Sequence, residues 1–253
     1  MNLNLKDKTI IVAGGLGGIG QQTVLDLIEE GAKVIVLTQG ILNSKSINNA
    51  SIHHIVNYQS DNELSKLFSN LIEEEIPIGL ISFIGTGRAE NITFQSDDDT
   101  DKLWEINYFN NRNIVKSFVK AIKEKDINKN TEPYFITLTS SIASNMFLNC
   151  PTEYTTSKAA LERLCKELSW KLSPDFRVNC ISPGNIYFKG GTWDKIKSEG
   201  IVDVDDLLTN KVPSGRFGTP KDISSIATFL SSPLATFING ACIRIDGGQS
   251  ISN

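Results

Sequence analysis

Short runs of apolar residues alternate along this chain with longer amphipathic stretches. The apolar runs are almost unbroken by polar residues and occupy 9–13, 33–37, 52–56, 78–84, 134–138, 177–181 and 241–245. Apolar positions at helical spacing fill 18–30, 64–72, 104–122, 152–172 and 222–230. Continuous apolar runs suit strands that are buried on both faces, and strand–helix alternation builds a parallel sheet. We therefore predict an α/β fold with seven strands in a parallel sheet and helices on both faces.

The sequence shows no boundary between domains. On length alone, its 253 residues suit one large domain or two smaller ones. No change of composition, internal repeat or low-complexity tract marks a linker, so we expect a single domain over 1–253. Residues 186–212, called the cover segment below, are the least regular span and mix aromatic side chains with lysines. We predict that this segment is a mobile cover over a substrate site.

Charge and cysteine content argue against several functions. Acidic residues outnumber basic ones by 29 to 25 without a cluster of Lys and Arg, so we expect no nucleic-acid or membrane-surface partner. The N-terminus carries charges where a signal peptide needs apolar residues, and no apolar run is long enough to span a membrane. These features favour the cytoplasm. Cys150, Cys165, Cys180 and Cys242 are scattered, which argues against a disulfide scaffold or a zinc site.

Two polar clusters are interpreted as structural. The acidic run Asp97–Asp101 is expected to begin a helix, because carboxylates favour the positive end of the helix dipole. The alternative is a metal site, but consecutive acids lack the spacing of oxygen ligands, and we expect no metal. His53 and His54 fall within the predicted third strand, where one buried and one exposed side chain are expected rather than a catalytic pair.

A glycine-rich turn joins the first predicted strand to the first predicted helix. The segment is Ala13–Gly20, which contains five glycines. Backbone without side chains allows a pyrophosphate to approach, and the first N–H groups of the helix point toward it. Glycines alone would indicate no more than a flexible turn, but this context between strand and helix predicts nucleotide binding.

A tyrosine and a lysine stand four residues apart on a predicted helix. Tyr154 and Lys158 therefore share a helix face, and a neighbouring ammonium is expected to lower the pKa of the phenol. Such a tyrosine can exchange a proton with a carbonyl or an alcohol, and Ser141 can hydrogen-bond the same oxygen. Taken alone, a solvated surface pair is the more common interpretation of this spacing.

Several motifs together resemble the classical short-chain dehydrogenase/reductase family over essentially the whole chain. In chain order they are Ala13–Gly20, Asn107, Ser141, Tyr154–Leu161, Val178–Gly184, Gly215–Pro220 and Asp246–Gly248. The resemblance implies a doubly wound Rossmann-type fold of one domain and an NAD(P)-dependent oxidoreductase. It also implies a homotetramer or homodimer, with the predicted helices 104–122 and 152–172 at the interfaces.

The resemblance assigns four catalytic roles. It implies that Tyr154 is the acid/base, that Lys158 holds the nicotinamide ribose, that Ser141 orients the substrate oxygen and that Asn107 anchors a water in a proton relay. It also implies a set of dinucleotide-binding residues. These are Gly14, Leu16, Gly18, Ile19, Gly20, Thr38, Asn57, Gly85, Tyr154, Lys158, Pro183, Gly184 and Ile186.

Four positions depart from the family pattern. Phe83 stands where asparagines normally brace the sheet, and we expect it to do so by packing. Thr38 stands where members that prefer NAD have an acid. Without that carboxylate the site is expected to prefer NADP slightly, and Lys45 is the residue expected to contact the 2′-phosphate. Asn57 replaces an acid near the adenine, and its amide can still accept that hydrogen bond. Phe188 stands where the family often has a threonine that binds the nicotinamide amide, so weaker binding of the nicotinamide is expected.

We predict hydride transfer between a nicotinamide cofactor and a small-molecule ketone or secondary alcohol. A catalytically silent nucleotide-binding regulatory protein is the alternative, motivated by the altered cofactor contacts; a lyase or epimerase that uses transient oxidation is a third. The stretches 145–148 and 190–195 are expected to line the substrate pocket. Met146, Phe147 and Trp193 would form an apolar wall, and Asn145 or Asp194 would give polar contacts.

Overall fold

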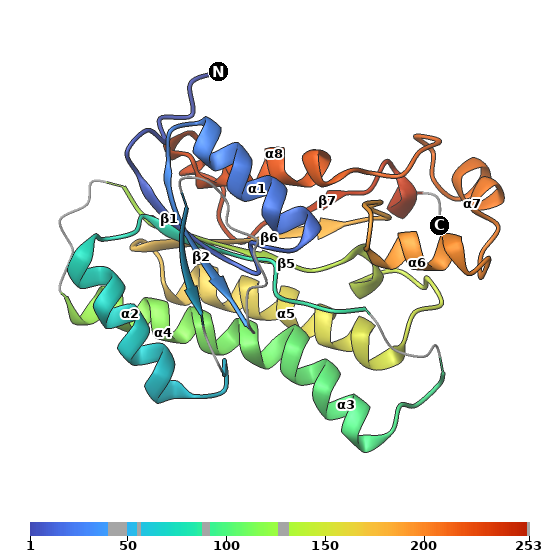
Figure 1. The fold of residues 1–253 in the computed structure, drawn as a ribbon, viewed down its shortest axis with the longest axis horizontal. Coiled ribbons are helices and arrows are strands. Elements are labelled where there is room, and N and C mark those ends of the chain that lie inside the picture. The colour runs from blue at the N-terminus through green and yellow to red at the C-terminus, as the bar shows by residue number, and fades with distance from the viewer. Residues whose placement is uncertain (40–49, 55–56, 88–91, 126–131, 252–253) are drawn as a thin grey trace.

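Seven strands form one parallel sheet in the order β3-β2-β1-β4-β5-β6-β7 (Figure 1). The structure is a computed structural model that describes residues 1–39, 50–54, 57–87, 92–125 and 132–251. The strands are β1 (Thr9–Ala13), β2 (Lys33–Thr38), β3 (Ala50–His54), β4 (Gly79–Ser82), β5 (Tyr134–Thr139), β6 (Phe176–Pro183) and β7 (Cys242–Ile245). The predicted seven-stranded, doubly wound parallel sheet is confirmed.

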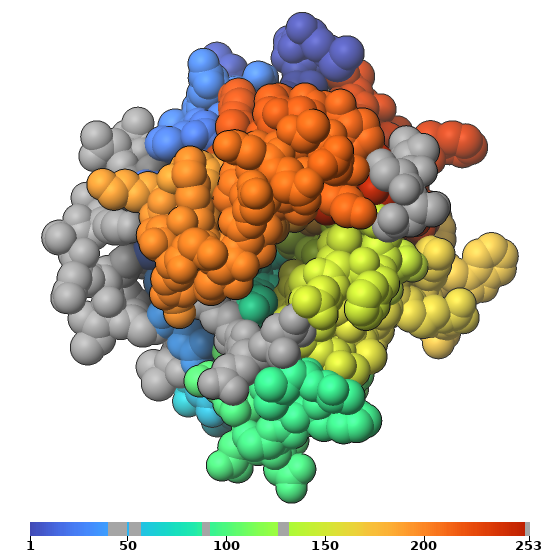
Figure 2. Space-filling model, turned by 90° about the vertical axis from the view of Figure 1, so that its right-hand side faces the viewer, coloured from blue at the N-terminus to red at the C-terminus, as the bar shows by residue number. Residues whose placement is uncertain are grey.

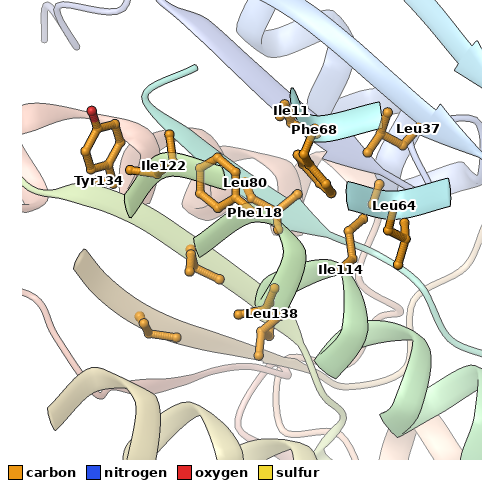
Figure 3. Close-up of a cluster of buried hydrophobic side chains, with 14 of the residues drawn as sticks. Ile11, Leu37, Leu64, Phe68, Leu80, Ile114, Phe118, Ile122, Tyr134 and Leu138 are labelled. Atoms are coloured by element: carbon orange, nitrogen blue, oxygen red, sulfur yellow. The ribbon is translucent and has the colours of Figure 1, made fainter. Parts of the chain in front are cut away.

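Helices cover both faces of the sheet. In Figure 1, α1 (Gly18–Glu29) and α8 (Pro220–Ser231) lie above it, and α2 (Asp61–Glu74), α4 (Asn110–Glu124) and α5 (Thr152–Lys171) lie below it. The largest core cluster joins the lower helices to the sheet. Figure 3 shows Phe68 of α2 beside Phe118 of α4, with ring centroids 5.9 Å apart, against Leu80 of β4. Burial on both faces explains why the central strands consist almost entirely of apolar residues.

The third and fourth strands differ from their predicted bounds. β3 ends at His54, whereas the predicted strand runs to Val56; Ile55, Val56 and the side chains of His53 and His54 lie outside the described residues. β4 ends at Ser82 rather than at Ile84. The Phe83 N–H still donates to the Ala13 carbonyl at 2.9 Å, after which the chain leaves the sheet toward the site described below.

The long helix predicted over 104–122 consists of three parts. α3 (Asp97–Trp104) begins at the acidic run, where the Ser96 side chain caps the Asp99 N–H, so the predicted helix start is confirmed. A π-helical turn over Glu105–Phe109 follows, and α4 then continues to Glu124. The π turn adds a residue to the helical repeat, a feature that periodicity does not reveal and that is frequent at functional sites.

The cover segment is more regular than expected. It contains two short helices, α6 (Thr192–Ser198) and α7 (Val204–Asn210), the second capped by the Asp203 side chain. The two helices add regular structure that the residue pattern does not predict, and the role of the segment as a mobile cover stays a prediction. In Figure 2 the orange surface of this segment and the yellow-green surface of the residues after β5 border a depression. Within the described ranges, no helix has the length and apolarity needed to cross a bilayer.

The Asn111 side chain ties α4 to the end of β4. Its carboxamide is fully buried, accepts from the Ser82 hydroxyl at 2.6 Å and donates to the Ile84 carbonyl at 3.1 Å. Phe83 is half-buried and packs against the apolar clusters on the upper face, as expected. The packing of Phe83 and the hydrogen bonds of Asn111 thus both hold the chain where it leaves β4.

We predict that Asn111→Leu lowers the free energy of unfolding by about 2–4 kcal/mol, because it takes away the acceptor of the buried Ser82 hydroxyl and the side-chain donor to the buried Ile84 carbonyl. Lys123→Leu at an exposed position of the same helix is the control, and a change within about 0.5 kcal/mol is expected there. Urea denaturation of both variants measures the difference. Equal effects would show that Asn111 does not brace the sheet.

Candidate active site

The glycine-rich turn has the conformation that an anion site needs. Gly14 has φ +74°, which favours glycine, and its N–H donates to the Leu37 carbonyl at 2.9 Å. A Cβ atom at Gly20 would lie 2.3 Å from the Gly14 carbonyl oxygen, so α1 can pack this closely only with glycine there. α1 begins after Gly17 without a side-chain cap. The N–H groups of the first turn therefore have no side-chain acceptor, and an external anion such as a pyrophosphate can serve as one.

The Phe188 ring lies against this helix start. A Cβ atom at Gly18 would be 2.4 Å from two ring carbons of Phe188, and one at Gly191 would be 2.9 Å from a third. The ring also packs in an apolar cluster with Ile19 and Phe83. An aromatic side chain thus covers part of the surface that a pyrophosphate would approach. The residues of the glycine cradle fit a pyrophosphate, because glycines line the turn and no side chain caps the start of α1.

Two sets of contacts hold the segment that carries Phe188. Ile186 forms a β-bridge with Gly218, and a Cβ atom at Gly218 would lie 2.5 Å from the Ile186 side chain. The Asp194 carboxylate accepts from the Tyr187 hydroxyl at 2.7 Å and from the Gly190 N–H at 2.8 Å. The bond from the Gly190 N–H, followed by the bond from the Tyr187 hydroxyl, lowers the pKa of Asp194 below its usual value. The Asp194 carboxylate thus has two partners within the protein, and its polar contact with substrate stays a prediction.

Tyr154 and Ser141 meet at the carboxyl edge of the sheet. Tyr154 lies in the first turn of α5, and Ser141 follows β5 at the start of a short 3-10 turn over Ile142–Ser144. Burial raises the pKa of Tyr154, a hydrogen bond with Ser141 lowers it, and the nearby Cys150 raises it. The net shift is upward, opposite to the expected direction, because loss of solvent outweighs the neighbouring polar groups.

Lys158 is the buried cation of the site. Its residue is 3% exposed, and its ammonium donates to the Thr139 carbonyl at 2.9 Å. Burial lowers the pKa of Lys158 to about 8, while Cys180 and Glu162 act in the opposite direction. A Cβ atom at Gly85 would lie 2.7 Å from the Lys158 nitrogen. A side chain at this place in the loop after β4 would therefore displace the ammonium from its present position.

Asn107 fixes the same loop from the π-helical turn. Its side chain accepts from the Thr86 N–H and donates to the Thr86 carbonyl, both at 2.9 Å, and donates to the Leu103 carbonyl at 3.0 Å. A Cβ atom at Gly85 would be 3.1 Å from the Asn107 Oδ1. The structure thus brings Asn107, Gly85 and Lys158 together. The water relay assigned to Asn107 stays a prediction.

The remaining predicted cofactor residues follow the ends of the strands. Thr38 is the last residue of β2, and Pro183 the last of β6, with Gly184 directly after it. Asn57 is exposed after β3, and its side-chain oxygen accepts from the Gln59 N–H at 2.7 Å. Leu16 is half-buried and packs on the upper face. Ligands of open parallel sheets bind outside these carboxyl ends. Lys45 lies outside the described residues.

Two features of the site escape sequence analysis. The Lys158 partner is a main-chain carbonyl of Thr139, and main-chain atoms leave no signal in residue types. The predicted pocket residue Asn145 donates to the Glu162 carboxylate at 2.6 Å, so its amide serves the protein. Of the predicted apolar wall, Phe147 is 90% exposed, and the Trp193 ring packs at a tilt against Phe217 with centroids 5.1 Å apart.

Comparison with known proteins places this arrangement in a family. A family model described as enoyl-(acyl carrier protein) reductase matches residues 14–250. The chain belongs to the short-chain dehydrogenase/reductase family. It is 26% identical over 263 residues to 7alpha-hydroxysteroid dehydrogenase of Escherichia coli, which covers 98% of this chain and 96% of the relative. It is 25% identical to isoepoxydon dehydrogenase of Penicillium expansum, with 98% and 96% covered.

A solved structure shows the same fold. The short-chain dehydrogenase of Leptospira borgpetersenii with bound NAD+ is 27% identical and superposes with a TM-score of 0.80, covering 97% of this chain and 94% of that one. As a member of the short-chain dehydrogenase/reductase family, the chain is an NAD(P)-dependent oxidoreductase that acts on CH–OH groups. The comparisons give no support to the silent regulatory alternative.

We predict that Lys158→Met raises the free energy of unfolding near pH 7. The depression of its pKa from 10.5 to about 8 corresponds to a cost of roughly 3.5 kcal/mol at about 1.4 kcal/mol per pKa unit. Because the unfolded chain binds this proton more tightly, wild-type stability rises with pH between these two values, and the advantage of the variant shrinks over that window.

Denaturation at several pH values measures this difference, with the exposed Lys166→Met as the matched control on α5. A constant offset between Lys158→Met and the wild type across the window would show that Lys158 carries no burial cost.

Proposed function

We propose that Tyr154 is the acid/base of hydride transfer between NADP and a ketone or secondary alcohol. The observation that carries this proposal is the convergence of Tyr154, Ser141, Lys158 and Asn107 at the carboxyl edge of the sheet. When bound, the dinucleotide supplies or accepts the hydride. The glycine turn holds its pyrophosphate, and the ends of β2, β4 and β6 hold the rest.

The chain's own groups then handle the proton. In the reduction direction the neutral Tyr154 hydroxyl donates to the substrate oxygen, and the raised pKa of Tyr154 keeps this proton in place at neutral pH. The Ser141 hydroxyl shares the oxygen and orients it. The Lys158 ammonium stabilises the phenolate that Tyr154 becomes, since an adjacent cation favours the charged form.

We predict that Tyr154→Phe lowers turnover of a ketone panel by about 10²–10⁴-fold, because the variant lacks the proton donor. The dinucleotide Kd, measured by fluorescence titration, is expected to stay near the wild-type value. Tyr134→Phe, at the amino end of β5, is the control and retains activity. Dinucleotide binding without any turnover that depends on Tyr154 would instead favour a silent binding protein.

NADP is the preferred cofactor in this proposal, because Thr38 leaves no carboxylate at the end of β2 to repel a 2′-phosphate. We predict that Thr38→Asp weakens NADPH binding and tightens NADH binding, each by about tenfold, or about 1.4 kcal/mol. The new carboxylate repels the phosphate and accepts from the ribose 2′-hydroxyl. Thr38→Asn is the uncharged control. An unchanged ratio of the two Kd values would place the 2′-position elsewhere.

We predict that Phe188→Thr tightens dinucleotide binding. In the wild type the half-buried ring must leave Gly18 and Ile19, and the lost packing of about 1 kcal/mol corresponds to roughly fivefold in Kd. Phe188→Tyr keeps the ring and should bind like the wild type. Weaker binding by the Thr variant would mean that the ring contacts the bound cofactor rather than competing with it.

Assembly into a homotetramer or homodimer is part of the same proposal. Large apolar side chains support it: Trp170 near the end of α5 is 86% exposed and Phe237 before β7 is fully exposed. Asn239 donates to the Ser169 carbonyl at 3.0 Å, which places these two segments side by side. An exposed aromatic pair next to an edge strand suits burial against another subunit.

A further inference from the structure

Glu162 is a buried carboxylate in the wall of the site that the proposed function leaves without a role. It lies on α5 one helical turn after Lys158, and the residue is 8% exposed. Its carboxylate accepts from the Ser144 hydroxyl at 2.6 Å, from the Asn145 amide at 2.6 Å and from the Ser182 hydroxyl at 3.3 Å. Burying a charge is costly, so its retention among three donors needs a reason beyond packing.

The donors come from the two segments that face α5 at the site. Ser144 and Asn145 belong to the turn that begins at Ser141, and Ser182 precedes the Pro183 and Gly184 pair at the end of β6. Glu162 thus joins the helix of Tyr154 and Lys158 to the serine turn and to a cofactor strand.

Glu162 is connected to Ser141 through Ser144. The Ser144 hydroxyl lies between the Glu162 carboxylate at 2.6 Å and the Ser141 carbonyl at 2.7 Å, and the Ser144 N–H donates to that carbonyl at 3.0 Å. The Ser141 hydroxyl oxygen in turn accepts from the Ala143 N–H at 3.2 Å. Displacement of Ser144 would therefore tilt the turn and move the Ser141 hydroxyl away from Tyr154.

The negative charge of Glu162 also acts on the buried ammonium of Lys158. Burial disfavours the charged form of Lys158. Two side chains, Cys180 of β6 and Glu162 of α5, act in the opposite direction and favour the protonated amine. Removing the negative charge leaves the desolvation of Lys158 less compensated.

We propose that Glu162 is a positioning residue for the reaction, fixing the Ser141 turn and supporting the charge of Lys158. This inference rests on the proposed function for its kinetic consequence but not for its electrostatic one. The decisive variant is Glu162→Gln, which keeps the shape and removes the charge. Glu167→Gln, on the exposed face of α5 in pairs with Arg163 and Lys171, is the matched control.

The first readout needs no activity. We expect the side chain of Lys158, followed by NMR in protein labelled at lysine, to titrate about one pH unit lower in Glu162→Gln than in the wild type. The control should titrate at the wild-type pH. An unchanged titration of Lys158 would overturn the electrostatic part, whether or not the protein turns over a ketone.

The second readout is kinetic. Glu162→Gln and Ser144→Ala, which removes the opposite end of the same contact, should each lower kcat by about 10- to 100-fold with dinucleotide Kd little changed. Glu162→Asp, which restores the charge, should recover part of the loss. If Glu162→Gln does not fold, Ser144→Ala still decides the question. A wild-type kcat in both variants would overturn the positioning role. If the wild-type protein turns over no ketone but Lys158 still titrates lower in Glu162→Gln, only the proposed function is contradicted.

Discussion

The buried ammonium of Lys158 is the constraint around which this site is built. A cation that is 3% exposed must replace its lost water with fixed polar groups. The Thr139 carbonyl at the end of β5 is one such group, and it positions α5 against the sheet. The loop after β4 passes beside the same nitrogen, and glycine at position 85 keeps side-chain atoms away from it. Asn107 then holds that loop through the main chain of Thr86.

The sheet makes this arrangement possible because parallel strands bring their carboxyl ends to one edge. β1 is followed by the glycine turn, β4 by the loop of Gly85, β5 by the turn of Ser141 and β6 by the Pro183 and Gly184 pair. Every group of the site except the helix residues therefore stands within a few residues of a strand end. The apolar interior that fixes the strands also fixes the chemistry, since the strands cannot slide without exposing side chains that are fully buried.

Much of this could be predicted from the sequence, for reasons that also explain the failures. Strands buried on both faces leave unbroken apolar runs, so the pattern predicts the bounds of β1, β2 and β5 to within one residue. Tyr154 and Lys158 share a face because helical spacing requires it. The π turn that carries Asn107 adds a residue that periodicity cannot register. The position of the Phe188 ring on Gly18, the two helices of the cover segment and the upward shift in the pKa of Tyr154 depend on tertiary packing, which no local pattern encodes.

One stripe of α5 sets the register of the whole site. Tyr154, Lys158 and Glu162 follow one another at intervals of four residues, so they lie along one face of the helix. The first meets the Ser141 hydroxyl, the second the Thr139 carbonyl and the third the donors of Ser144, Asn145 and Ser182. A helix is stiff along its axis, so a displacement at one of these contacts is transmitted to the other two. The buried carboxylate at the far end of the stripe therefore bears on the geometry of the phenol at its start.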